Sequence, residues 1–417
     1  MSKKLLTPRD FINISDKNIY ETADYFQEFI NQMDDKKSNA FDITTTSPTG
    51  TIVDVIDRYS GNPINARSFV SSNYLGINTH PKVKEVAIKA IEKYGVGTST
   101  TPLIGGYLDI HKELEQKIAR MHKKEDALLF SSGFAANVGV AQPMLTKKDI
   151  AIVDTYIHAS MYDGLSSTNV KIFGHNDMEY LETTLKNNKG KYRNMLVVLD
   201  GVYSQDGDLT KLPEIVDVAK KYGAFIIVDD AHGVGVFGEN GSGICNHFGV
   251  EDKVDIITGT LSKGIGAMGG YIAGSKQLIK YLRHFARTSI FSASLTPATV
   301  ASASKAIDLM TEEPQLIEKL WENTNYIRKE LVKRGFDIGR SESPIIPVMV
   351  RDDMKAKIIA RKLLERGIYI IPATYPAVKL KDSRLRLNVS ASHTKEDLDY
   401  FCESLSIINK DINFTNN

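Results

Sequence analysis

The chain has 417 residues, of which 42% are hydrophobic and 25% are charged, and its formal net charge is +1. This length allows a large core and two domains, and the near-neutral charge gives no electrostatic reason to expect a nucleic-acid partner. No apolar run approaches the roughly 18 residues of a transmembrane helix, and the N-terminus has no apolar segment typical of a secretory signal. We therefore expect a soluble cytoplasmic protein, for which only peripheral contact with a membrane stays open.

The first 60 residues are polar, and we interpret residues 1–60 as an irregular N-terminal arm with one helix near Ile19–Gln32. Helical spacing of apolar residues predicts further helices over residues 80–95 and His111–His122. Beyond them, apolar runs that end in polar residues indicate strands buried on both faces. These runs are Ala151–Asp154, Met195–Asp200, Phe225–Asp230 and Asp255–Thr260, and the helix Leu212–Tyr222 separates the second from the third. Buried strands joined by helices predict an α/β domain with a mostly parallel sheet, which we place at residues 61–300.

The pattern changes near residue 300. One long helix is followed by the strand Ile345–Val350, a helix that ends at Arg366 and the alternating strand Arg384–Ser390. The last helix opens with Thr394 and Asp397 in the spacing of a capping box. This order of elements predicts a smaller α+β domain over residues 301–417.

Polar side chains gather at the carboxyl ends of the predicted strands. Ligands of open α/β sheets bind beyond these ends, so we expect one crevice to collect the side chains found there. They are Asp154 and His158, Asp200 and Ser204, Asp229 and His232, and Thr260, Ser262 and Lys263.

Several other kinds of site are excluded. Gly-x-Gly-x-x-Gly occurs at residues 233–238 and 264–269, but no predicted helix begins on these glycines, as dinucleotide binding requires. There is no Walker P-loop, and the nine histidines form no metal-binding pattern, so we expect no metal. The two cysteines, Cys245 and Cys402, are far apart in the sequence, and we expect both to be reduced thiols.

The remaining pattern suits pyridoxal phosphate. That cofactor needs a lysine for its Schiff base and an acid that keeps its pyridine nitrogen protonated, and Lys263 and Asp229 are placed for these roles. His232 could bind the phenolic oxygen of the ring. The turn Ser131–Phe134, between a predicted strand and a run of small residues, could offer backbone N–H groups to the phosphate. Each residue also has an ordinary explanation: a solvated lysine, a capping acid, a loop histidine and a strand-to-helix turn.

Seven motifs together resemble the α-oxoamine synthase family, from about Ser68 to Thr394. They are SSNYLGI, LFSSGFAAN, DGVYSQDGD, VDDAHGVG, GTLSKGIGAMGG, FSASLTP and RLRLNVSASHT. The resemblance implies a fold-type I enzyme dependent on pyridoxal 5'-phosphate, with a large domain built on a mostly parallel sheet and a smaller C-terminal α+β domain. It also implies a homodimer that condenses an amino acid with an acyl thioester and releases carbon dioxide.

The same resemblance implies roles for individual residues. Lys263 would form the Schiff base and act as acid and base, Asp229 would pair with the pyridinium nitrogen, and His158 would stack on the ring. His232, assisted by Ser204, would bind the phenolic oxygen. The phosphate would be held by Ser132, Gly133, Phe134, Thr260 and Ser262, with Ser292 reaching it from the neighbouring subunit. Asn73 and Arg386 would hold the amino-acid carboxylate, because a guanidinium clamps a carboxylate with two hydrogen bonds. Without the resemblance, Arg386 could be a solvated strand residue like Arg384.

Within the family, FGHNDMEYLE, FDIGRSESPIIPV and the long FSASLTPATVAS segment are most similar to bacterial serine palmitoyltransferases. This similarity favours L-serine and a long-chain acyl-CoA as substrates, with 3-ketodihydrosphingosine as product, and a place in sphingolipid biosynthesis. Two arginines common in the family are absent: Pro102 stands in place of one, and Ile370 and Ile371 precede the proline-rich loop where the other is expected.

Other activities stay open. Glycine C-acetyltransferase and 8-amino-7-oxononanoate synthase share all the motifs above. An aminotransferase is a rival from another reaction class, although the motifs HAS, DGVYSQDGD and RLRLNVSASHT favour the acyltransferase. A non-catalytic subunit is the binding-protein alternative, and Lys263 with Asp229 and His232 argues against it.

Overall fold

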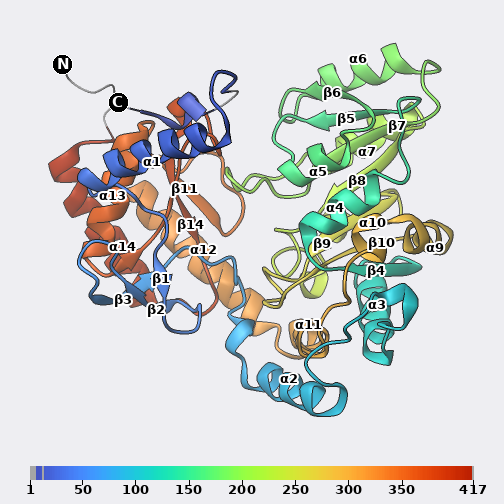
Figure 1. Cartoon of the computed structure of the whole chain (residues 1–417), viewed down its shortest axis with the longest axis horizontal. Coiled ribbons are helices and arrows are strands. Elements are labelled where there is room, and N and C mark those ends of the chain that lie inside the picture. The colour runs from blue at the N-terminus through green and yellow to red at the C-terminus, as the bar shows by residue number, and fades with distance from the viewer. Residues whose placement is uncertain (1–5, 12–13, 416–417) are drawn as a thin grey trace. The chain divides into compact units, whose positions relative to one another are not determined.

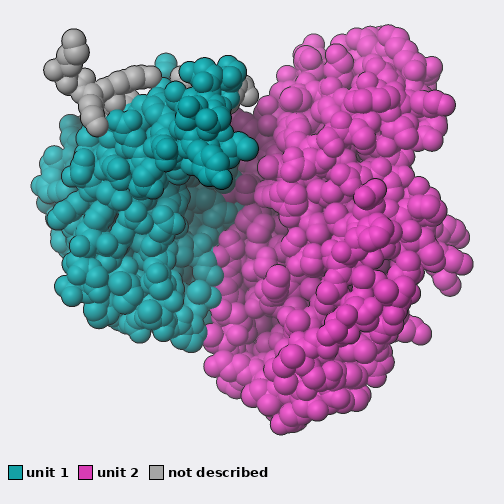
Figure 2. All heavy atoms as spheres, in the orientation of Figure 1, with its two compact units in different colours: residues 1–71, 205–207, 322–417 teal, residues 72–204, 208–321 magenta. Residues whose placement is uncertain are grey.

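The computed structural model describes residues 6–11 and 14–415 (Figure 1). The chain forms two compact units, which are coloured separately in Figure 2. Unit 1 comprises the described parts of residues 1–71, 205–207 and 322–417, and unit 2 comprises residues 72–204 and 208–321. The arm predicted over residues 1–60 includes residues 1–5 and 12–13, which lie outside the described ranges.

Unit 2 is built on a seven-stranded sheet with the order β4-β10-β9-β8-β7-β5-β6. Only β10 runs antiparallel to its neighbours β4 and β9, while β9, β8, β7, β5 and β6 are parallel. The predicted mostly parallel sheet is therefore confirmed. Its strands in chain order are β4 (Asp126–Phe130), β5 (Ile150–Asp154), β6 (Asn169–Phe173), β7 (Met195–Asp200), β8 (Phe225–Asp229), β9 (Ile256–Thr260) and β10 (Gly270–Gly274).

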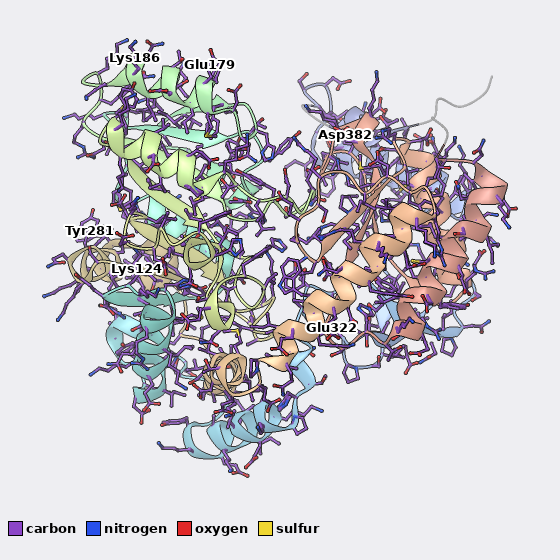
Figure 3. All side chains as sticks on the ribbon, turned by 180° about the vertical axis from the view of Figure 1, so that it is seen from behind. Lys124, Glu179, Lys186, Tyr281, Glu322 and Asp382 are labelled. Carbon is purple, nitrogen blue, oxygen red and sulfur yellow. The ribbon has the colours of Figure 1, made fainter. Side chains whose placement is uncertain are left out.

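Helices cover this sheet because its central strands are apolar on both faces. All six residues of β7 are buried, as expected for a strand between two helical layers. On one face, Ala136 and Val140 of α4 and Ile279 and Leu282 of α9 share a core with strand side chains. Tyr281 fixes α9 by donating its hydroxyl to the carbonyl of Pro143 at 2.8 Å (Figure 3). The α-helices of unit 2 are α2 (Pro81–Tyr94), α3 (Asp109–Met121), α4 (Gly133–Ala141), α5 (Ala159–Gly164), α6 (Met178–Asn188), α7 (Leu212–Lys221), α8 (Ile244–His247), α9 (Lys276–Phe285), α10 (Arg287–Ile290) and α11 (Pro297–Glu312).

The single long helix predicted from about residue 300 is wrong. The structure has two helices, α11 and α12 (Gln315–Lys333), with a break at Glu313 and Pro314. Proline has no backbone N–H and disfavours helical backbone in the residue before it, so the helix ends here although the apolar periodicity of the sequence continues. Unit 1 begins again within α12 at Glu322, which is labelled in Figure 3.

Unit 1 contains two small sheets. One is antiparallel, with the order β11-β14-β13, and comprises β11 (Ile345–Met349), β13 (Pro372–Ala373) and β14 (Arg384–Asn388). The other has the order β1-β2-β3-β12 and comprises β1 (Thr44–Thr45), β2 (Ile52–Ile56), β3 (Pro63–Ser68) and β12 (Ile368–Tyr369). The α-helices of this unit are α1 (Ile19–Asp35), α13 (Asp353–Glu365), α14 (Lys395–Ile412) and the second part of α12. The predicted capping box of α14 is present at Thr394 and Asp397.

The description of the N-terminal arm as irregular apart from one helix is wrong. Alternating residues in β2 place Val53 and Val55 in a core with Ala66 and Tyr369, which is the period of a half-buried strand. The predicted helix near Ile19–Gln32 is confirmed and extends to Asp35.

Both cysteines are free thiols, as the sequence predicts, and both are fully buried. Among the described residues, no helix is long and apolar enough to cross a membrane. The same residues contain no cluster of histidine, cysteine and acidic side chains suited to a metal ion.

Candidate active site

The carboxyl ends of the parallel strands in unit 2 lie at one edge of the sheet. Asp200 at the end of β7 pairs in register with Asp229 at the end of β8, and Asp229 pairs with Thr258 near the end of β9. Lys263 follows β9 after a short turn. Except for Arg386, every residue for which the sequence predicts a site role belongs to unit 2.

Asp229 is held in one orientation. Its Oδ2 accepts a hydrogen bond from Nδ2 of Asn137 at 2.6 Å, and its Oδ1 accepts one from the backbone N–H of Ala231 at 3.0 Å. Asn137 is fixed in turn, because its Oδ1 accepts from the Thr258 hydroxyl at 2.7 Å and its Nδ2 also contacts Ser160 at 2.9 Å. The carboxylate is 6% exposed. These hydrogen bonds hold the Asp229 carboxylate in one orientation, as pairing with the nitrogen of a pyridinium ring requires.

No role was predicted for Asn137 from the sequence. A signal was available, since Asn137 is the only polar side chain in α4 and is 3% exposed. A buried amide in a helix of glycine, alanine, valine and phenylalanine needs hydrogen-bond partners, and the strand ends of the sheet provide them.

His232 has a buried partner, Tyr74, for which no role was predicted either. The hydroxyl of Tyr74 and Nδ1 of His232 are 2.6 Å apart, and the two side chains are 1% and 7% exposed. Tyr74 lies in the SSNYLGI motif, where only Asn73 was assigned a role. The hydrogen bond fixes the position of the imidazole.

The predicted phosphate turn combines a helix N-terminus with hydroxyl groups. Ser132 caps α4 by accepting from the backbone N–H of Ala135 at 3.0 Å. Gly133 begins the helix close to β9, because a Cβ at this position would lie 3.1 Å from the Cβ of Thr260. The hydroxyls of Thr260 and Ser262 are 2.8 Å apart. Backbone N–H groups at a helix N-terminus beside hydroxyl donors suit a phosphate group.

His158 lies at the start of α5. Its Nδ1 is 2.7 Å from the Ser160 hydroxyl, and its ring centroid is 6.4 Å from that of Phe134. The His158 side chain is exposed, and so is Phe134. The structure therefore brings this histidine to the phosphate turn, with a ring face available for stacking.

Lys263 is half-buried in the turn after β9. Burial raises the pKa of the Asp200 carboxyl well above its usual value, and the charge of Asp229 raises it further. The backbone N–H of His158 and the ammonium of Lys263 act in the opposite direction on Asp200. Asp200 therefore favours its neutral form.

Asn73 is also close to the lysine turn. The backbone N–H of Gly266 donates to the carbonyl of Lys263 at 2.9 Å, and a Cβ at Gly266 would lie 3.2 Å from Oδ1 of Asn73. Ser204 is half-buried in the segment that follows β7. Ser292 lines a small cavity together with Pro102 and Ser131, and its predicted contact with a second subunit stays a prediction.

A charged cluster supports the loop that carries Ser204. Nδ1 of His175 is 3.1 Å from Asp154, and Nε2 is 2.8 Å from Asp208. Burial by itself lowers the pKa of His175, but the hydrogen bonds to Asp154 and Asp208 outweigh it and raise the pKa to about 9. The imidazolium also packs edge-on against Tyr203. His175 lies in FGHNDMEYLE and Asp208 in DGVYSQDGD, but no role was predicted for either residue.

Arg386 lies on β14 in unit 1. Its Nη1 donates to Oδ1 of Asn388 at 2.9 Å, and Nδ2 of Asn388 donates to the carbonyl of Val70 at 2.8 Å. The description of Arg384 as solvated is wrong: it is 3% exposed and pairs with Asp206 at 2.7 Å. The alternation of β14 places the two arginines on the same face, and tertiary contacts bury one of them.

The residues of unit 2 fit pyridoxal phosphate. A fixed carboxylate, a lysine on the adjoining turn and a helix N-terminus beside hydroxyl groups match the ring nitrogen, the aldehyde carbon and the phosphate of that cofactor.

Comparisons with known proteins agree with a site for pyridoxal phosphate. The family model for aminotransferase class I and II matches residues 68–405. The 8-amino-7-oxononanoate synthase of Thermoanaerobacter pseudethanolicus is 47% identical over 345 residues, which are 82% of this chain and 87% of that protein. The serine palmitoyltransferase of Sphingobacterium spiritivorum is 42% identical over 339 residues, which are 81% of this chain and 85% of that protein.

A solved structure of SPT with PLP as an internal aldimine has a TM-score of 0.90 and 30% identity, and covers 95% of this chain and 100% of that chain. Both named relatives are α-oxoamine synthases, so the motifs and the fold lead to one family. The chain belongs to the α-oxoamine synthases, acyltransferases of fold type I that depend on pyridoxal phosphate.

Proposed function

We propose that the chain condenses an amino acid with an acyl thioester to give a 2-amino ketone, with release of the free thiol and carbon dioxide. The observation that supports this most directly is the fixed carboxylate of Asp229, held by Asn137 and Ala231 in the unit that also carries Lys263. When bound, pyridoxal phosphate withdraws electrons from the α-carbon of the amino acid.

In this proposal Lys263 removes the α-proton and later returns a proton to the same carbon. Asp229 keeps the ring nitrogen protonated, and the pair of His232 and Tyr74 positions a hydrogen bond to the phenolic oxygen. His158 stacks on the ring. Arg386 and Asn73 hold the α-carboxylate, which orients the α-proton toward the lysine until the carboxylate leaves as carbon dioxide.

For the substrates, we propose the 8-amino-7-oxononanoate synthase type in preference to the serine palmitoyltransferase type. The higher identity, 47% against 42%, supports this choice. The product in that name is a nine-carbon acid with its ketone at carbon 7 and its amine at carbon 8. Carbons 8 and 9 correspond to alanine without its carboxylate, so carbons 1–7 form an acyl group that ends in a second carboxylate.

Serine palmitoyltransferase activity is the second candidate. The TM-score of 0.90 with SPT and the FGHNDMEYLE segment favour it. Both candidates share the homodimer that we propose, in which Ser292 of one subunit reaches the phosphate held by the other.

The experiment is a substrate panel on purified holoenzyme, with thiol release measured for alanine, glycine and serine against acyl-CoA donors. The donors are acetyl, heptanoyl, palmitoyl and the mono-thioester of heptanedioic acid. We expect the highest kcat/KM with alanine and the heptanedioic thioester. A preference for serine with palmitoyl-CoA would favour the second candidate, and absence of thiol release with every pair would contradict the proposed function.

A further inference from the structure

Unit 1 contains a cavity of about 650 Å³, and of its described lining residues only Arg386 has a role in the proposed function. This volume is typical of pockets for small ligands. Helix α1 contributes Phe26, Phe29 and Met33 to its wall, and the segment 371–377 around β13 contributes another part. The lining is mainly apolar, which suits a hydrocarbon chain.

One wall of this cavity carries a buried lysine. Lys357 of α13 is 5% exposed, and its Nζ lies 3.9 Å from the sulfur of Met33 and 5.8 Å from the ring centroid of Phe29. Among the described residues, no carboxylate comes within ion-pair distance of this ammonium. Burial lowers the pKa of Lys357, and the charge of Asp353 opposes that effect only in part.

Asp42, the one acid among the described lining residues of the cavity, is already paired. Asp42 forms an ion pair with Arg58 at 3.3 Å. An ammonium among apolar groups costs free energy unless an anion or hydrogen-bond acceptors compensate it. The cavity therefore combines an apolar lining with a buried positive charge at Lys357, which is suited to an anionic end group.

Arg386 lines the same cavity. The inference rests on the proposed function, in which Arg386 holds the carboxylate of the amino acid. Since the acyl group becomes bonded to the α-carbon beside that carboxylate, a cavity shared by Arg386 and Lys357 can receive the acyl chain. A methyl-ended chain would leave the ammonium against hydrocarbon, whereas a carboxylate-ended chain would pair with it.

We infer that this cavity binds the acyl chain and that Lys357 selects donors whose chain ends in a carboxylate. Lys357 is then a specificity-determining residue, which binds the end of the acyl group remote from the reacting carbon. Its ion pair with the terminal carboxylate is formed in an apolar environment, where a charged hydrogen bond is stronger than in water.

The test compares two thioesters of equal carbon number, the mono-CoA thioester of heptanedioic acid and heptanoyl-CoA. The ratio of their kcat/KM values is measured for the wild-type holoenzyme, Lys357→Met and Lys357→Arg. We expect Lys357→Met to reduce the preference for the dicarboxylic donor by roughly 10- to 100-fold, as for the loss of one charged hydrogen bond. Lys357→Arg should keep most of the preference.

Lys362→Met is the matched control, because Lys362 lies on the same helix and its side chain is 41% exposed. This variant should change the kcat/KM value for neither of the two thioesters. An unchanged preference in Lys357→Met, or a wild-type enzyme that favours heptanoyl-CoA, would overturn the inference.

A binding measurement separates this inference from the proposed function. Free heptanedioate should raise the Tm of the wild-type holoenzyme more than heptanoate does, and this difference should vanish in Lys357→Met. If no thioester reacts but the Tm difference holds, the proposed function fails and the carboxylate site stands. If both acids shift the Tm equally, the carboxylate site is wrong even when thiol release is observed.

Discussion

At the scale of single residues, the proposed chemistry depends on side chains that hold other side chains in place. Asp229 can act on a ring nitrogen only if its carboxylate keeps one orientation, and Asn137 provides the shorter of the two hydrogen bonds that fix it. Asn137 is therefore a positioning residue. It is buried and does not need to contact the substrate.

Replacing Asn137 with alanine should reduce kcat by roughly 10- to 100-fold, because Asp229 loses a hydrogen bond to a charged group. The KM for the amino acid should change less. The specific readout is the pH dependence of the visible absorbance of the bound cofactor, which should shift because protonation of its ring nitrogen is less well supported.

Asn169→Ala is the control, since the amide of Asn169 donates to the backbone carbonyls of Lys147 and Asp149. If Asn137→Ala keeps the wild-type spectrum at every pH and loses only stability, Asn137 has a purely structural role.

At the scale of elements, the sequence predicted the strands β5, β7, β8 and β9 of unit 2 and the elements β11, α13, β14 and α14 of unit 1. Strand β7 was predicted over the residues where it is found, Met195–Asp200. Its apolar run is continuous and ends at a polar residue, Asp200, so the bounds of the strand can be read from the sequence. The predictions failed where local patterns carry no signal. Apolar periodicity continues through the break at Pro314, and β2 is short and lies between polar turns.

The site residues were found where they follow strand ends, as Asp229 and Lys263 do. Tyr74 and Asn137 were missed because their roles depend on pairing with residues 158 and 92 positions away. Such pairs are products of the tertiary fold, and the composition of α4 marks Asn137 as unusual without identifying its partner.

The cluster of His175, Asp154 and Asp208 joins β5 and β6 to the loop after β7, and its contribution to stability depends on pH. The pKa of His175 is about 9 in the folded protein and about 6.5 in an unfolded chain. The stabilisation is therefore fully present below about pH 6.5 and is lost as the pH rises through about 9.

We expect His175→Gln to lower the free energy of unfolding by about 3 kcal/mol at pH 6, because two buried carboxylates lose their cation. The difference from wild type should shrink at pH 10, as measured by guanidinium unfolding. His284→Gln, at an exposed position on α9, should change stability little at either pH. A deficit for His175→Gln that does not vary between pH 6 and pH 10 would show that His175 is not charged in the folded protein.

At the scale of the whole molecule, residues far apart in the sequence build one unit. β3, at residues 63–68, pairs in parallel with β12, at residues 368–369. The cavity that contains Lys357 exists only because α1 packs in the same unit as α13. The periodicity of one element carries no information about contacts between residues more than 300 positions apart. The cavity that contains Lys357 could therefore not be predicted from the sequence.

The proposed homodimer makes a prediction about shared sites. If Ser292 acts across the interface, Ser292→Asp and Lys263→Ala should each be inactive, the first because its carboxylate repels the phosphate. A mixed dimer of the two variants contains one complete site, so equal mixing should restore roughly a quarter of wild-type activity. Sedimentation should show a dimer for both variants. A mixture that stays inactive although mixed dimers form would place Ser292 outside the partner's site.

The central claim is that Lys263 carries the cofactor and moves the proton of an acyl-transfer reaction. Its most direct test is thiol release from an acyl-CoA by Lys263→Ala, alongside borohydride reduction of the wild-type holoenzyme and mapping of the labelled peptide. We expect the variant to fold with a Tm close to wild type and to release no thiol above background with any amino acid. In the wild-type holoenzyme, we expect the label on the peptide containing Lys263. Full turnover in Lys263→Ala, or a label on another lysine, would contradict it.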